Sequence, residues 1–155
     1  MKPPDSRIRQ GHRLLQLGML LLLFALLVGI AVPKFAVPRL GLSTHLLALT
    51  QGLFLAVTGL LWPRLRLTPG AARVAFWLGV YGCLAPLVAN LLAAIWGAGN
   101  TLLPIAAGQA HGSELQEKVI AAGLRSGGAA LIAIVLLILW GLRGEGEQHG
   151  VGGKP

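Results

Sequence analysis

Charge is scarce in this chain of 155 residues: Asp, Glu, Lys and Arg make up 12% of it, against about 25% in an ordinary globular domain. Four stretches carry none, residues 14–33, 40–63, 74–113 and 126–142. A hydrocarbon core of about 30 Å needs roughly 20 apolar residues of helix. Each stretch can hold one such span, the third with a long loop besides and the fourth with a few residues added before it. The sequence therefore predicts an all-α, four-helix membrane domain with no second domain.

Acidic side chains are absent from these stretches, although the chain has five Asp and Glu in total. Ion-driven transporters and proton pumps usually need membrane-buried carboxylates, so that class is disfavoured. Hydrolysis by two carboxylates at membrane depth is excluded. The single cysteine, Cys83, excludes a disulfide framework and a thiolate metal site. There is also no Gly-rich phosphate loop and no zinc-type ligand cluster.

Basic residues give a net charge of +8, and they gather at the ends of the expected spans. One side carries Lys2, Arg7, Arg9, Arg13, Arg64, Arg66, Arg73, Arg143 and Lys154, and the other carries Lys34, Arg39, Lys118 and Arg125. Because cytoplasmic loops are enriched in Lys and Arg, this asymmetry predicts both termini in the cytoplasm. The same distribution argues against nucleic-acid binding.

The expected segments are a basic lead over 1–13, spans over about 14–32, 45–62, 74–96 and 119–142, and a flexible tail over 143–155. A cleaved signal peptide is the alternative for the first span, because Gly29-Ile30-Ala31 could be cleaved. Its apolar run is long for the 7–15 residues of such a peptide, and its removal would leave an odd number of spans.

The links between the spans, and a proline within the third span, give further predictions. Residues 34–42 should form a short link, after which Ser43 or Thr44 can cap the second helix. Pro86 removes a backbone hydrogen bond within the third span, which predicts a kink. The apolar first half of the loop over 99–118 should fold back over the helix ends as a lid.

His45 lies at the start of the second span, at one end of a strip of small residues. The strip continues through Ala48, Gly52, Ala56 and Gly59, at spacings that keep all five on one helical face. Small residues let helices approach closely in lipid. His45 should therefore point toward a neighbouring helix. It could be an interfacial histidine bonded to a loop carbonyl, or it could ligate a haem or act as an acid and base.

Gln51 and Asn90 are neutral polar residues of adjacent antiparallel spans, and each is expected about 9 Å from the non-cytoplasmic end of its span. They could hydrogen-bond across helices or hold a polar atom of a substrate. Arg125 is expected to snorkel or face inward, paired with Glu114 or Glu117.

The remaining chemical groups are interpreted more simply. Tyr81 is expected in packing or a cross-helix hydrogen bond, and Cys83 as a small core residue. His12 and His149 are expected to be solvated, and His111 to stay outside the site.

Three segments resemble the hydroxylaminobenzene mutase family of small four-span membrane enzymes. They are PRLGLSTHLLALTQGLFLAVTGLLW (38–62), YGCLAPLVANLLAAIWGAG (81–99), and LLPIAAGQAHG (102–112) with the closing LWGLRG (139–144). The resemblance spans about two thirds of the chain. It implies isomerisation of hydroxylaminobenzene to 2-aminophenol without an external redox cofactor. The family is similar to the styrene oxide isomerases, membrane trimers that use a ferric haem b as a Lewis acid.

By this resemblance His45 occupies the haem-ligating position, and Gln51 and Asn90 are the catalytic residues. Tyr81 and Arg125 could support the site from outside. Gln51 stands where Asn is usual, and Pro86 and Val37 also stand at positions where Asn is common. These departures bear on the substrate more than on the fold.

The resulting hypothesis is a multi-pass protein of a bacterial-type inner membrane, acting on a small apolar aromatic substrate as a homo-oligomer, a trimer by resemblance. The alternative is a non-catalytic membrane subunit or transporter-like module assembled through its small-residue faces.

Overall fold

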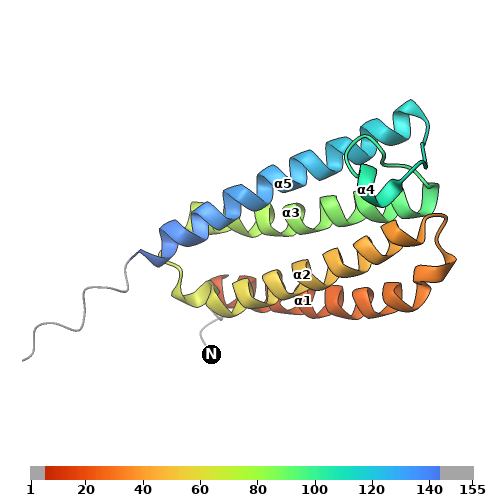
Figure 1. The fold of residues 1–155 in the computed structure, drawn as a ribbon. Coiled ribbons are helices and arrows are strands. Elements are labelled where there is room, and N and C mark those ends of the chain that lie inside the picture. The colour runs from red at the N-terminus through yellow and green to blue at the C-terminus, as the bar shows by residue number, and fades with distance from the viewer. Residues whose placement is uncertain (1–5, 144–155) are drawn as a thin grey trace, which may run out of the picture.

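Helix is the only regular secondary structure in residues 6–143, the part of the chain that the computed structural model describes. The long helices are α1 (Ser6–Ala31), α2 (Pro38–Leu61), α3 (Pro69–Trp96) and α5 (Glu114–Leu142). Short elements complete the fold: α4 (Pro104–Ala107) and the 3₁₀ turns η1 (Val32–Lys34) and η2 (Trp62–Arg64) (Figure 1). Each long helix is long and apolar enough to cross a membrane. The all-α prediction is confirmed, while the expectations for residues 1–5 and 144–155 lie outside the described residues.

Every long helix begins earlier than its predicted span. The largest consequence is in α2, which starts at Pro38 with the extended residue Val37 before it. Proline suits the first turn of a helix because it has no N–H to leave unpaired and its φ is already helical. The prediction that Ser43 or Thr44 caps this helix is therefore wrong. Both lie inside it, where the Thr44 hydroxyl donates to the Leu40 carbonyl.

The basic lead is also partly helical, because α1 begins at Ser6. At the other end of the chain, α5 begins at Glu114, five residues before the predicted start of its span. Ser113 caps it, and Gln116 returns a hydrogen bond to the Ser113 N–H. This reciprocal pair satisfies two donors at the helix start, so the helix can extend beyond its apolar part.

The helices form two closely packed pairs. Helix α1 packs along α2, α3 packs along α5, and the contact between α2 and α3 joins the pairs. Across the molecule the order is thus α1, α2, α3, α5 (Figure 1). As a result, α2 and α3 each have neighbours on two sides, whereas α1 and α5 leave broad apolar faces exposed.

Glycines on both helices bring α1 and α2 into backbone contact. A Cβ at Gly18 would lie 2.6 Å from both the Gly52 oxygen and the Ala56 nitrogen, and one at Gly59 would lie 2.6 Å from the Gly11 oxygen. The predicted strip on α2 does pack against a neighbour, and that neighbour is α1. The matching residues of α1 recur every seven positions (Gly11, Gly18 and Ala25), which is two helical turns.

Pro86 lies within α3, which continues as one helix from Pro69 to Trp96. Its ring is buried against Gly127 of α5, where a Cβ would overlap the ring carbons. The glycine therefore lets α5 approach α3 at the proline.

The loop between α3 and α5 folds over the ends of α2 and α3, as expected for a lid. Its short helix α4 packs on α2, and Ala107 is buried in a small apolar cluster. That cluster comprises Leu40, Ala93, Ala94, Ala98, Ala107 and Ile120.

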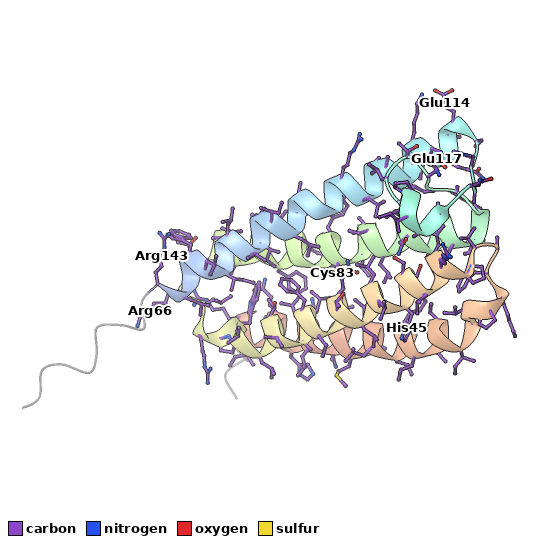
Figure 2. All side chains as sticks on the ribbon, viewed as in Figure 1. His45, Arg66, Cys83, Glu114, Glu117 and Arg143 are labelled. Carbon is purple, nitrogen blue, oxygen red and sulfur yellow. The ribbon has the colours of Figure 1, made fainter. Side chains whose placement is uncertain are left out.

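One carboxylate ties this loop to α5. Glu117 accepts hydrogen bonds from the backbone N–H groups of Gly99 (2.7 Å), Thr101 (3.1 Å) and Gly112 (3.2 Å). Glu114 instead pairs with Lys118 at 2.6 Å on the exposed side of the helix. Figure 2 shows both glutamates at one end of the molecule, opposite Arg66 and Arg143.

We expect Glu117→Ala to release the loop, because it leaves three N–H groups without their charged acceptor. Hydrogen bonds to charged groups are worth about 1.5–3 kcal/mol each, so the loss should be at least about 2 kcal/mol of local stability. Hydrogen–deuterium exchange should then accelerate over residues 97–113. Glu114→Ala is the matched control, since an exposed ion pair contributes little. Equal exchange in both variants would contradict the assignment.

Candidate functional site

His45 lies on α2 with its ring against α1 and its side chain half-buried. Its Nδ1 is 2.7 Å from the carbonyl oxygen of Ala25, a fully buried residue of α1. Since a carbonyl can only accept, Nδ1 carries the hydrogen, and in the neutral form of the ring the lone pair lies on Nε2. A histidine held in this way presents Nε2 as a metal ligand or base.

Space for the ring comes from a second residue of α1. A Cβ at Gly29 would lie 2.9 Å from both Cε1 and Nδ1 of His45. Ala25 thus supplies the hydrogen bond and Gly29, one turn later, supplies the room. Sequence reasoning missed both residues, although their spacing of four places them on one face of the first span.

Gly29→Ala should displace the His45 ring and weaken its bond to Ala25. Disturbing a group that orients a ligand or base typically costs about 10–100-fold in activity or metal affinity. We expect a loss of this size, with little change in helix content by circular dichroism. Gly128→Ala is the control, because no atom lies within 4 Å of that Cβ position. Full activity in Gly29→Ala would show that the ring need not stay where it is.

Asn90 is held by a residue that sequence reasoning assigned to a helix cap. Its Nδ2 donates to Ser43 Oγ at 2.9 Å across the contact between α3 and α2. Asn90 is only 2% exposed, and its Oδ1 has no partner in the described chain. Because the Ser43 oxygen accepts this bond, its own hydroxyl hydrogen is left to donate elsewhere.

Gln51 is 4% exposed, and neither its Oε1 nor its Nε2 has a hydrogen-bond partner among the described residues. Such a buried, unpartnered amide costs free energy, so it calls for a ligand or water. Gln51 lies eight residues after Ser43, about 12 Å further along α2. The expectation that Gln51 and Asn90 lie at equal depth is therefore wrong, because α2 starts seven residues before its predicted span.

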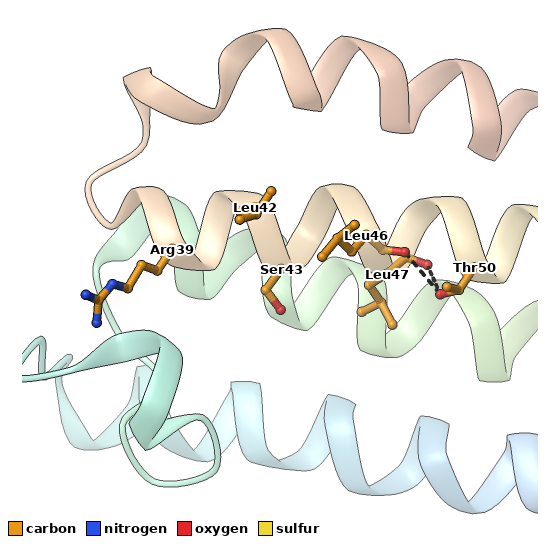
Figure 3. A pocket seen from close by; sticks show the side chains of 6 residues that line it. All are labelled: Arg39, Leu42, Ser43, Leu46, Leu47 and Thr50. Carbon is orange, nitrogen blue, oxygen red and sulfur yellow. Dashed lines mark hydrogen bonds between the residues drawn. The ribbon is translucent and has the colours of Figure 1, made fainter.

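Ser43 also lines a groove of about 420 Å³ along α2 (Figure 3). Its other lining residues are Arg39, Leu42, Leu46, Leu47 and Thr50. The Thr50 hydroxyl is already bonded to the carbonyls of Leu46 and Leu47. Within residues 6–143, Ser43 is thus the hydroxyl of this groove that accepts a hydrogen bond and donates none.

The structure does not gather the three predicted site residues into one cluster. Successive residues lie about 100° apart around a helix, so Ser43 and His45 project from nearly opposite sides of α2. The Ser43–Asn90 pair therefore lies at the α3 contact, while His45 lies at the α1 contact.

The supporting residues lie elsewhere. The Tyr81 hydroxyl is 2.8 Å from Ser126 Oγ on an exposed part of the α3–α5 contact, which confirms the expected cross-helix hydrogen bond. Arg125 is exposed on α5. Its predicted pairing with Glu114 or Glu117 is wrong, since Glu117 binds the loop backbone and Glu114 binds Lys118.

The remaining histidines and the cysteine follow their expectations where the structure describes them. His12 and His111 are exposed, and Cys83 is fully buried as a free thiol. His149 lies outside the described residues.

No group of three or more His, Cys, Asp and Glu converges within residues 6–143. These side chains alone therefore do not form a multi-ligand metal site there. A lone imidazole with a fixed hydrogen-bond partner suits a metal that brings its other ligands, as in a porphyrin.

Fold and site define a small all-α protein with four membrane-length helices, a single oriented imidazole and two buried amides. A model of the styrene oxide isomerase family matches residues 10–143, and the chain belongs to that family.

Two curated relatives are named as mutases. Hydroxylaminobenzene mutase HabB of Ectopseudomonas oleovorans is 46% identical over 90% of this chain and 85% of its own length. Hydroxylaminobenzene mutase HabA of the same organism is 40% identical over 81% of this chain and 93% of its own. Family and relatives together identify an enzyme of the isomerase or mutase type. No solved structure matches the chain significantly.

Proposed function

We propose that this protein is a membrane-embedded isomerase that rearranges a small aromatic N- or O-substituted substrate, of the hydroxylaminobenzene to 2-aminophenol type. The observation that carries the proposal is the His45–Ala25 hydrogen bond at 2.7 Å. It orients one imidazole within a chain whose relatives are named as mutases.

We propose a haem as the cofactor, held through Nε2 of His45. The Nδ1–H bond to a backbone carbonyl is the arrangement typical of metal-ligating histidines, and it raises the basicity of the ligand. When bound, a ferric haem supplies a Lewis acid for the oxygen of the substrate.

Gln51 supplies the polar contacts that an apolar pocket lacks. An amide offers both a donor and an acceptor, and Gln51 has both unused. We propose that Gln51 orients the substrate's N–O or C–O group. Asn90 acts through the Ser43 hydroxyl that it holds. The apolar surroundings keep water away from a cationic intermediate.

We place the chain in a bacterial-type inner membrane with both termini in the cytoplasm, as a homo-oligomer and a trimer by family resemblance. The four apolar helices support membrane insertion. Arg66 and Arg143 share one end of the molecule (Figure 2), in keeping with that orientation.

The test is to supply hydroxylaminobenzene to membranes containing the chain, with no added cofactor, and to follow 2-aminophenol by chromatography. The expected result is product formation above that of membranes from cells lacking the gene, together with a Soret absorption band in the purified protein. No conversion of this substrate or of an aryl epoxide would overturn the proposed function. Conversion without a Soret band would overturn only the proposal of a haem cofactor.

A further inference from the structure

A wholly apolar cavity of about 250 Å³ lies between three of the helices. Its walls include Leu17, Leu21 and Phe24 of α1, Leu55 of α2, and Val80 and Leu84 of α3. The groove in Figure 3 is lined by α2 alone. Walls from three elements make this cavity a pocket that the fold itself maintains.

The size of the cavity fits one aromatic ring with a small substituent. An engineered cavity of about 150 Å³ lined by Leu, Ile and Phe side chains stays dry and binds benzene. The space here is larger and its walls are of the same chemical kind. Water would gain no hydrogen bonds from these walls, so the cavity favours an apolar occupant.

The unpartnered amide lies next along the same helix face. Gln51 precedes Leu55 by four residues, so the two side chains are neighbours on α2. Ligand pockets typically combine apolar walls with a few polar groups that fix orientation. Gln51 is not itself a lining residue, but a ring against Leu55 lies about one helical turn from the free donor and the free acceptor of Gln51.

The cavity is open to the side of the molecule. Helices α1 and α3 make little contact with each other, and Leu20 and Leu84, which also line the cavity, are 60% and 36% exposed. In a bilayer this opening would face lipid, where small apolar aromatics concentrate. A substrate could therefore enter without crossing water.

We infer that this cavity is the ring pocket of the enzyme: it holds the aryl group of an arylhydroxylamine while Gln51 contacts the N–O substituent. The inference rests on the proposed function for the identity of the substituent. The pocket itself is argued from the walls, the volume and the unpartnered amide.

Ring binding can be measured without turnover. In a Cys83→Ala background, Val80→Cys places a thiol in the cavity wall, where benzyl methanethiosulfonate should modify it. Aniline should slow this reaction about tenfold when present at ten times its dissociation constant. Leu136→Cys is the matched control, because Leu136 lies on the exposed face of α5 away from the cavity, and aniline should not protect it.

Filling the cavity gives the second readout. Leu84→Trp should lower kcat/KM about 10–100-fold, mainly through KM, because an added ring occupies the space of the substrate. Leu136→Trp on the exposed face of α5 should not change it. If aniline protects the Val80→Cys thiol saturably but the protein turns over no substrate, the pocket is supported and the proposed function is overturned. Turnover without protection would overturn the pocket and favour a lipid chain as its occupant.

Discussion

His45→Ala is expected to abolish isomerase activity and the Soret band of the proposed haem together while leaving the helices packed. The variant removes the imidazole whose Nδ1 is held 2.7 Å from the Ala25 oxygen. Loss of a group that only orients a ligand costs about 10–100-fold, so loss of the ligand itself should exceed about 100-fold. Turnover of hydroxylaminobenzene and the absorption spectrum of the purified variant measure the two effects.

Two controls separate the chemistry of His45 from its packing. His111→Ala changes an exposed loop histidine and should leave both readouts unchanged. His45→Gly leaves room for free imidazole, which should restore part of the Soret band when added. A His45→Ala protein that kept both its turnover and its Soret band would refute the ligand assignment. Normal turnover without the band would refute the catalytic need for the haem.

The sequence predicted the helices better than their limits. The four charge-free stretches predicted the four helices. The strip of small residues that begins at His45 predicted close packing of the second helix. The seven-residue shift in the start of α2 comes from Pro38, which lies within the predicted link but favours a first helical turn. That shift moved Ser43 from a cap into the helix, where it could reach Asn90.

The site could not be assembled from the sequence because its contacts cross between helices. Spacing along α2 placed His45 on the small-residue strip, yet only the packing of α1 on α2 shows that Ala25 binds the ring. Similarly, Gln51 and Asn90 could be recognised as buried amides, but their relative depth depends on how α2 and α3 align. Periodicity predicts on which face of a helix a residue lies, but it does not predict which residue of another helix contacts it.

Gly18→Ala should destabilise the protein, which reverses the usual effect of this change. Within a helix, alanine is more favourable than glycine by about 1 kcal/mol. At Gly18 the added methyl would lie 2.6 Å from the Gly52 oxygen and the Ala56 nitrogen, both backbone atoms that cannot rotate away. The helices must separate, and overpacking of this kind costs about 1–3 kcal/mol. Unfolding followed by circular dichroism in detergent should show a net loss of up to about 2 kcal/mol.

The same separation should reach the site, because Ala25 lies two turns beyond Gly18 on the face of α1 that packs on α2. Moving α1 away lengthens the bond from His45 to Ala25, so turnover should fall along with stability. Gly128→Ala makes the identical chemical change on α5 where no atom lies within 4 Å, and it should stabilise the protein or leave it unchanged without loss of activity. If Gly18→Ala were as stable as Gly128→Ala, α1 and α2 would not be in backbone contact. The position of the His45 ring, which depends on that contact, would then need another cause.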